Sequence, residues 1–269
     1  MNHRIPAVLG TALIIFAGAA LAQDPAKTLN CDQRGGNSRQ ERVCEMREMP
    51  LASTGALNVD AAPNGGLSVK AWSQAGVLVR AKVEAWGETK SQAESRLKEV
   101  QIATAGNKVN ATGPKSMGQT YYSVSFEVFV PKNTNLDLHS TNGGITINGI
   151  NGTIAARTTN GGLKLAGLAG KVSAHTTNGG VKVELAGNTW QGEGFDVSTT
   201  NGGVDIQVPA DYSARLEAST TNGGFRSDLP VKAEGGHTGK RVNATLGRGG
   251  ALVKVQTTNG GIRVNRAGV

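Results

Sequence analysis

Basic side chains recur two residues after a repeated five-residue phrase, and they are the residues in this sequence best suited to bind a charged ligand. Thr-Thr-Asn-Gly-Gly occurs five times, and a Ser-Thr-Asn-Gly-Gly variant begins at Ser140. The second residue after each Gly-Gly pair is, in order, Thr146, Lys164, Lys182, Asp205, Arg226 and Arg263. Strands in a sheet lie about 4.8 Å apart, so stacked repeats would let these charges act together on an anionic polymer. The alternative is a charged face that only prevents aggregation.

The histidines after residue 22 show no arrangement typical of catalysis or metal binding. His139 and His175 stand three residues before the asparagine of the phrase, a position that is Arg157 in the repeat between them, and the remaining histidine is His237. A zinc site would need histidines on adjacent or next-adjacent repeats with a carboxylate nearby. We interpret the histidines as surface polar residues and predict neither a metal site nor a cofactor. Arg157 and His175 remain further candidates for ligand binding.

The sequence also lacks the motifs of common enzyme classes. It contains no Gly-x-Ser-x-Gly, His-Glu-x-x-His or Walker phosphate loop. Asp137 and Asp196 share an exposed column, but a paired acid and base need a cleft. We therefore predict a protein that is not an enzyme; the alternative is a polysaccharide-acting hydrolase or lyase on a solenoid scaffold, with acids clustered on one face. Aromatic residues make up only 4% of the chain, so recognition of a specific nucleic acid by base stacking is not expected.

Cys31 and Cys44 are the only cysteines, and their spacing is not the Cys-x-x-Cys of redox or zinc motifs. In an oxidising compartment the simplest interpretation is one structural disulfide, which closes a loop of about a dozen residues and stabilises the fold by about 3 kcal/mol. A metal site would need more ligands than this segment supplies.

Residues 1–22 have the basic start, apolar centre and small-residue end of a cleaved secretory signal peptide. Gln23 follows the predicted cleavage site, so a lipid anchor on cysteine is not expected; an uncleaved membrane helix is the alternative. No later segment is apolar enough to span a membrane. We therefore expect an exported protein in the periplasm, at the cell surface or outside the cell. The formal net charge of +8 favours anionic partners or serves solubility alone.

Alternation of apolar and polar residues on both sides of the phrase predicts the elements that position the basic column. Residues six and four positions before each asparagine are apolar, and so are the first and third residues after each Gly-Gly pair, except Ser227. Such period-two alternation is typical of half-buried strands. Each unit therefore consists of a strand, an Asn-Gly-Gly corner, a second strand and a second corner. The units differ in length only at this second corner. The asparagines of the first corner are Asn142, Asn160, Asn178, Asn201, Asn222 and Asn259.

Two all-β architectures fit these units. Asn-Gly is a strong signal for a two-residue hairpin loop, so an array of antiparallel hairpins stays open. We favour a β-solenoid that resembles a single-stranded β-helix, with about 18–23 residues per unit. Ile150 and Leu168, apolar residues between the glycines of second corners, suit a solenoid interior, and the asparagines are expected to stack as an amide ladder. The Gly-Gly pairs are expected to supply positive φ angles, so valine at Gly161 or Gly179 would destabilise the fold.

The part of the chain before the regular repeats predicts a less regular lead-in. Residues 56–72 resemble another unit with Asn64 at its corner, and residues 77–86 and 121–131 are predicted strands. The one predicted helix spans residues 89–101, with Thr89 and Gln92 at capping-box spacing. The predicted divisions are a signal peptide (1–22), a polar segment with the disulfide loop (23–53), and one domain (54–269) with a lead-in (54–135) and regular repeats (136–269).

The runs FEVFVPKNTNLDLHSTNGGITI and GRGGALVKVQTTNGGIRV, with the repeated phrase and the strand-helix-strand lead-in, resemble the bacterial putative-adhesin domain family of unknown function. The resemblance covers roughly Ala56 to the end and implies an exported or envelope β-solenoid. The chain differs by the Cys31 to Cys44 segment ahead of the domain and by Asn-Gly-Gly where the family often has Asn-Gly-Asp. We therefore predict a non-enzymatic structural or adhesion module of the bacterial cell envelope that binds an anionic envelope polymer or surface glycan.

Overall fold

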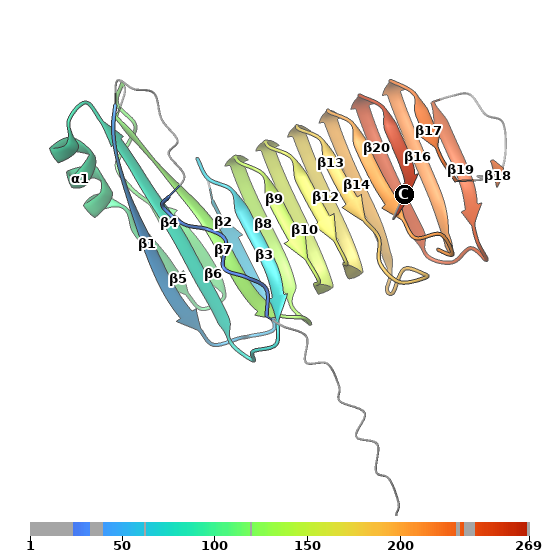
Figure 1. Ribbon diagram of the computed structural model, residues 1–269, viewed down its shortest axis with the longest axis horizontal. Helices are drawn as coiled ribbons and strands as arrows, with labels where there is room; N and C mark the ends of the chain where they lie inside the picture. The colour runs from blue at the N-terminus through green and yellow to red at the C-terminus, as the bar shows by residue number, and fades with distance from the viewer. Residues whose placement is uncertain are drawn as a thin grey trace, which may run out of the picture.

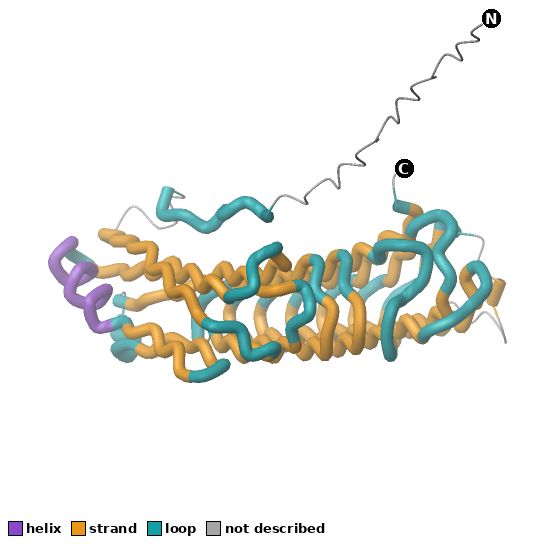
Figure 2. The backbone as a smooth tube through the Cα atoms, turned by 90° about the horizontal axis from the view of Figure 1, so that it is seen from below, coloured by secondary structure: helices purple, strands orange, loops and turns teal. Residues whose placement is uncertain are grey.

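Two β-sheets face each other along the length of the molecule and enclose its apolar core (Figures 1 and 2). The computed structural model describes residues 24–32, 40–61, 63–118, 120–229, 232–233 and 240–267. Within these residues one sheet has ten strands, in the order β1-β4-β7-β3-β9-β11-β13-β15-β21-β17. The other has eleven, in the order β18-β19-β16-β20-β14-β12-β10-β8-β2-β6-β5. The predicted all-β class, with a helix in the N-terminal part, is confirmed.

Each regular unit places its first strand in the eleven-stranded sheet and its second strand in the ten-stranded sheet, with the Asn-Gly-Gly corner between them. The first strands are β8 (Asn135–Asn142), β10 (Asn151–Asn160), β12 (Ala169–Asn178), β14 (Gly194–Asn201), β16 (Ala214–Asn222) and β20 (Leu252–Asn259). The second strands are β9 (Ile145–Asn148), β11 (Leu163–Ala166), β13 (Val181–Glu184), β15 (Val204–Val208), β17 (Phe225–Ser227) and β21 (Ile262–Arg266). Because the two strands of a unit lie in different sheets, the corners are not hairpins, and the arrangement is solenoid-like.

Equivalent strands of neighbouring units pair in parallel with like residues side by side. β10 pairs with β12 so that Ile154 lies opposite Val172 and Asn160 opposite Asn178. The columns six and four residues before the asparagine are buried, as the alternation predicted. Ile150 and Leu168 at the second corner are 0% and 8% exposed, which confirms that they face the interior.

The last unit in the sequence lies inside the stack rather than at its end. β20 pairs with β14 on one side and with β16 on the other, and β21 lies between β15 and β17 in the same way. Between β17 and β20 the chain forms β19 (Arg241–Leu246), which pairs antiparallel with the outer side of β16, and β18 (Lys232–Ala233), which pairs with β19. The units therefore do not stack in chain order.

The lead-in contains the predicted irregular unit and the predicted strands. β2 (Ala56–Asp60) pairs with β8, β3 (Leu67–Trp72) pairs with β9, and Asn64 lies opposite Asn142. β4 (Val77–Gly87) and β7 (Tyr121–Pro131) pair antiparallel with each other. β1 (Glu41–Leu51) pairs antiparallel with β4 along its whole length, a strand that the sequence analysis missed. β5 (Gln101–Ala105) and β6 (Lys108–Thr112) extend the eleven-stranded sheet beyond β2.

Helix α1 (Lys90–Glu99) has the predicted capping box. The Thr89 hydroxyl oxygen accepts the Gln92 backbone N–H, and the Gln92 side-chain oxygen accepts the Thr89 N–H. Ala93 on its inner side is fully buried. The helix packs against β4 and β1 at the end of the molecule opposite β18 (Figure 1), where it covers the end of the sheet.

Candidate binding trough

Side-chain amides form a continuous ladder along the Asn-Gly-Gly corner. The Nδ2 of Asn160 donates to Oδ1 of Asn142, and that of Asn178 donates to Oδ1 of Asn160, both at 2.8 Å. Equivalent bonds continue the ladder through Asn201, Asn259 and Asn222, and at the other end to Asn64. The amide ladder predicted from the sequence is therefore confirmed, in the stacking order of the structure.

The hydroxyl residue two positions before each asparagine supports the corner from inside. The residues at this position are buried: Ser140, Thr158, Thr176, Thr199, Thr220 and Thr257. Each hydroxyl donates to the carbonyl oxygen of the first glycine in the neighbouring unit, at 2.7 Å from Thr176 to Gly161. The sequence analysis missed this role, although these residues stand two positions after the second buried column and so continue its alternation.

The corner glycines are required for a different reason from the predicted one. Neither Gly161 nor Gly179 has a positive φ, whereas Gly149 and Gly167 in the second corners have φ of 75° and 59°. The prediction of positive φ at Gly161 and Gly179 is therefore wrong. A Cβ at Gly161 would lie 2.2 Å from the Gly143 carbonyl oxygen, and one at Gly179 would lie 2.1 Å from that of Gly161. The first glycine is needed because neighbouring backbones approach too closely for any side chain.

A shallow trough of about 640 Å³ runs along the outer face of the ten-stranded sheet, beside the corner. The second glycines of five units leave its floor without side chains: Gly144, Gly162, Gly180, Gly203 and Gly261. The exposed or half-exposed side chains along it are Thr146, Lys164, Lys182, Asp205 and Arg263, and the buried residues Leu163, Val181 and Val204 complete its lining. It crosses β9, β11, β13, β15 and β21, a distance of roughly 19 Å for four strand spacings.

The structure brings the predicted basic column together along this trough. Lys164 lies beside Lys182, and Arg263 lies between Asp205 and Arg226. All four basic residues are exposed, and no ion pair joins any of them to another residue in the described part of the chain. Asp205 interrupts the column and accepts a hydrogen bond from Asn265 at 3.0 Å. Arg226 is not part of the trough lining and extends the column past Arg263.

Arg157 and His175, the other two predicted binding residues, lie on the outer face of the other sheet. They pair in register on β10 and β12, with His139 on the other side of Arg157. His175 Nδ1 is 2.9 Å from the Ser198 hydroxyl, and His139 Nδ1 is 2.9 Å from an Asp60 carboxylate oxygen. Both histidines are exposed, as predicted. The two predicted groups of binding residues therefore form no common site. His237 lies outside the described residues.

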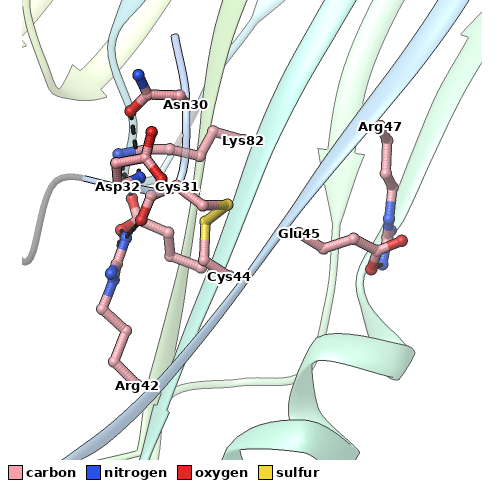
Figure 3. The surroundings of a disulfide bond; sticks show 9 residues. Asn30, Cys31, Asp32, Arg42, Cys44, Glu45, Arg47 and Lys82 are labelled. Atoms are coloured by element: carbon pink, nitrogen blue, oxygen red, sulfur yellow. Dashed lines mark hydrogen bonds and ion pairs between the residues drawn. A yellow bond between two sulfur atoms is a disulfide. The ribbon is translucent and has the colours of Figure 1, made fainter.

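A second group of charges surrounds residues 24–31, which we call the N-terminal strap and which lie against the outer face of the ten-stranded sheet (Figure 2). At one end the Asp24 carboxylate accepts the Ser73 backbone N–H at 2.7 Å. At the other end Cys31 forms a disulfide with Cys44 of β1, with 5.8 Å between their Cα atoms (Figure 3). The predicted disulfide is therefore confirmed, and it fastens the strap to the sheet.

Glu127 on β7 binds the middle of the strap. Its carboxylate, 1% exposed, accepts the Thr28 backbone N–H at 2.9 Å and the Thr28 hydroxyl at 2.7 Å. Lys70 donates to the same carboxylate at 2.8 Å, and Arg80 also bonds to it. Burial raises the pKa of Glu127, but the hydrogen bonds from Lys70, Thr28 and Leu29 outweigh burial and lower the pKa to about 2. The sequence analysis did not identify Glu127, because its partners lie far apart in the chain.

Among the described residues, no cluster of three or more histidine, cysteine, aspartate or glutamate side chains has an arrangement that could bind a metal ion. In the same residues, no helix combines the length and apolar character needed to cross a bilayer.

Comparison with known proteins finds one family model and several solved structures that match the chain. The family model described as Toastrack DUF4097 matches residues 97–265, more than half of the chain. The crystal structure of a putative cell adhesion protein from Clostridium sporogenes is 13% identical, with a TM-score of 0.45, and the match covers 83% of this chain and 100% of that one. A putative adhesin from Bacteroides fragilis is 11% identical, with a TM-score of 0.35 and coverage of 82% and 97%. No curated protein matches the chain.

Proposed function

The chain belongs to the Toastrack DUF4097 family, which is the putative-adhesin domain family of unknown function that its sequence resembles, and we propose that it is an exported binding module of the bacterial cell envelope. In this proposal the trough binds an anionic envelope polymer or surface glycan. The observation that supports it is the position of Lys164, Lys182 and Arg263, exposed and unpaired among the described residues, beside a floor of glycines.

An extended anionic polymer suits this trough better than a small molecule. With Arg226 included, the cations span four strand spacings, roughly 19 Å, in a line parallel to the long axis of the molecule. Individual exposed charges contribute little, so binding depends on several contacts along one chain. The glycine floor adds no side chains that would keep a polymer backbone away from the sheet.

We propose a non-enzymatic role for the trough. Asp205 is the one carboxylate among the residues that line it. Hydrolysis of a glycosidic bond needs two carboxyl groups on opposite sides of the bond. A hydrolase or lyase remains the alternative, and turnover of a polysaccharide by the purified protein would favour it.

We also propose the finer description of fold and location. The fold would be a β-solenoid that resembles a single-stranded β-helix, with units of about 18–23 residues. The predicted divisions at residues 22 and 53 remain proposals; the signal peptide and its cleavage site lie outside the described residues. The Cys31–Cys44 disulfide supports export to the periplasm or beyond, because such bonds persist in oxidising compartments.

The test compares two variants with the same change in net charge. The trough variant replaces Lys164, Lys182, Arg226 and Arg263 by glutamine. The control variant replaces four basic residues that point outward from the eleven-stranded sheet and were not predicted to bind a ligand: Lys171, Arg215, Arg241 and Lys254. Binding to a polyuronate is measured at low salt, with neutral dextran as the ligand control.

We expect the trough variant to lose about fivefold or more in affinity, from the sum of several exposed contacts, and the control variant to lose less. The difference should disappear near molar salt, because screening removes exposed charge contacts. Circular dichroism checks that both variants are folded. Equal binding by wild type and trough variant at low salt, or an equal loss in the control, would overturn the proposal.

A further inference from the structure

We propose that Asn222 is a site of spontaneous chemical modification, at which the side-chain amide is lost and an aspartate or isoaspartate remains. This inference goes beyond the proposed function and does not depend on it. The observation that carries it is the position of the Asn222–Gly223 corner at the end of the asparagine ladder, where no further unit follows among the described residues.

The reaction needs only these two residues and water. The backbone nitrogen of Gly223 loses its proton to a base in the solvent and attacks Cγ of Asn222. A C–N bond forms, the bond from Cγ to Nδ2 breaks, and the leaving group takes a proton from water and departs as ammonia. Water then adds to either carbonyl of the resulting succinimide, which gives aspartate or isoaspartate. Glycine favours the attack because it has no Cβ to hinder the approach.

The sequence contains nine Asn-Gly pairs, and at most of the inner corners the attacking nitrogen is already hydrogen-bonded. The N–H groups of Gly161 and Gly179 each donate to the backbone carbonyl oxygen of the asparagine in the next unit, at 3.0 Å. Gly65, Gly202 and Gly260 form the same bond. Deprotonation and attack would break it, so the stacking that builds the ladder also protects these asparagines.

The side-chain amides of the inner corners are fixed as well. Each donates from Nδ2 to the asparagine on one side and accepts at Oδ1 from the asparagine on the other. This holds for Asn142, Asn160, Asn178, Asn201 and Asn259. Cγ cannot turn toward the next backbone nitrogen unless these bonds break. Among the described residues Gly143 lacks the N–H bond of the other inner corners, but the Asn142 side chain before it is held on both sides.

The Asn222–Gly223 corner has fewer restraints than any of these. Asn222 Nδ2 donates to Asn259 at 2.8 Å, but within the described residues its Oδ1 accepts no hydrogen bond and the Gly223 N–H has no partner. Gly223 is exposed, whereas the first glycines of the inner corners are buried or half-buried. The strand that follows, β17, is the last of the ten-stranded sheet and lies toward the end of the molecule opposite α1 (Figure 1). The nucleophile, the amide and water therefore meet most easily at this corner.

The experiment follows deamidation of the purified protein at mildly alkaline pH, by proteolysis and mass spectrometry of each Asn-Gly peptide. In the native state we expect Asn222 to react about tenfold or more faster than Asn160, Asn178 and Asn201, because two hydrogen bonds absent at Asn222 each slow the inner corners by about a factor of five. The same rates are then measured in concentrated urea. There the chain is unfolded, and all the Asn-Gly sites should react at similar rates.

Asn148–Gly149 is the internal control, because the Gly149 N–H donates to the Ala166 carbonyl oxygen at 3.0 Å while no described residue bonds the Asn148 side chain. It should react more slowly than Asn222. Asn222→Ser should remove the fast release of ammonia from the native protein, which assigns that signal to this residue.

Part of the product at position 222 should be isoaspartate, detected with an isoaspartyl methyltransferase, because only the succinimide route forms it. Aspartate alone would overturn that route. If Asn222 reacts no faster in the native protein than the inner corners or Asn148, or if its preference persists in urea, the inference is wrong.

Discussion

At the scale of single residues, four of the five positions of Thr-Thr-Asn-Gly-Gly have separate structural roles. The first threonine donates inward to a glycine carbonyl of the next unit, and the asparagine donates along the corner to the next asparagine. The first glycine lets two backbones come close together, and the second leaves the trough floor free of side chains. Repetition of the phrase follows from these contacts, because every unit meets the same neighbour in the same way.

Alanine at a first corner glycine should destabilise the protein even though the backbone conformation suits it. In Gly161→Ala the new methyl group would lie 2.2 Å from the Gly143 carbonyl oxygen, so two units must move apart. We expect a loss of about 2–3 kcal/mol, as for other overpacked sites, measured as a lower midpoint of denaturant unfolding.

The matched control is Gly224→Ala at a second corner glycine beside the end strand β17. No atom lies within 4 Å of its added Cβ, and its φ is not positive, so the cost should stay below about 0.5 kcal/mol. Equal unfolding midpoints for the two variants would contradict the close-approach explanation.

At the scale of elements, the strap shows how a segment without regular secondary structure is held on a sheet. Its backbone groups bond to side chains from β3 and β7, its Asp24 carboxylate accepts the backbone N–H of Ser73 just after β3, and its disulfide reaches β1. Glu127 is the central partner because it bonds to the strap and to two cations of the sheet at once. The strap therefore depends on one buried carboxylate that must stay ionised.

The contribution of Glu127 to stability should be lost in acid. Its pKa is about 2 in the folded protein against 4.5 as the ordinary value. A lowered pKa stabilises the fold fully above pH 4.5, and the stabilisation falls as pH decreases from 4.5 toward 2. This difference between the two pKa values corresponds to a contribution of about 3 kcal/mol to the free energy of unfolding.

Glu127→Gln should therefore be less stable than wild type at pH 7. The difference in unfolding free energy between the two proteins, measured by urea unfolding, should become smaller between pH 4.5 and 2. Glu193→Gln removes an exposed carboxylate 3.3 Å from Lys171 and should show little difference from wild type at any pH. If the difference between Glu127→Gln and wild type stays constant down to pH 2, the ionised Glu127 carboxylate is not what holds the strap.

At the scale of the whole molecule, the units form a stack whose order differs from the order of the chain. The last unit lies between two earlier ones, and its strands β20 and β21 pair with the strands of both neighbours in the two sheets. Arg263 thereby lies next to Asp205, and Arg226 is moved to the end of the column. The charge pattern along the trough is thus a consequence of the stacking order.

Engineered disulfides test this order. Ser198 on β14 lies opposite Gln256 on β20, and Gln256 lies opposite Ser219 on β16. Cysteines at 198 and 256 are one strand spacing apart, about 4.8 Å, and should form a disulfide; cysteines at 198 and 219 are two spacings apart and should not. Mass spectrometry of each unreduced double-cysteine variant shows whether its disulfide has formed. A bond between 198 and 219 would show that the units stack in chain order.

Local patterns were enough to predict the strands of the repeated units, the Asn-Gly-Gly corners, the amide ladder, the capped helix and the basic column. Side-chain alternation decides which residues face the core, and a corner depends on a few adjacent residues, so both are present in short stretches of sequence. The same columns left an array of antiparallel hairpins open, and Ile150 and Leu168 favoured the solenoid-like arrangement. The structure decided between the two, because the two strands of each unit lie in different sheets.

Only the tertiary structure decided the place of the last unit, the reason for the first corner glycine, the trough and the binding of the strap. The unit at Asn259 has the same local pattern as the others, so nothing in it specifies its neighbours. The contact between Gly161 and Gly143 and the bonds between Glu127 and Thr28 join residues that are distant in the chain. Such features depend on which segments meet in space, and the sequence pattern of a single segment does not contain that information.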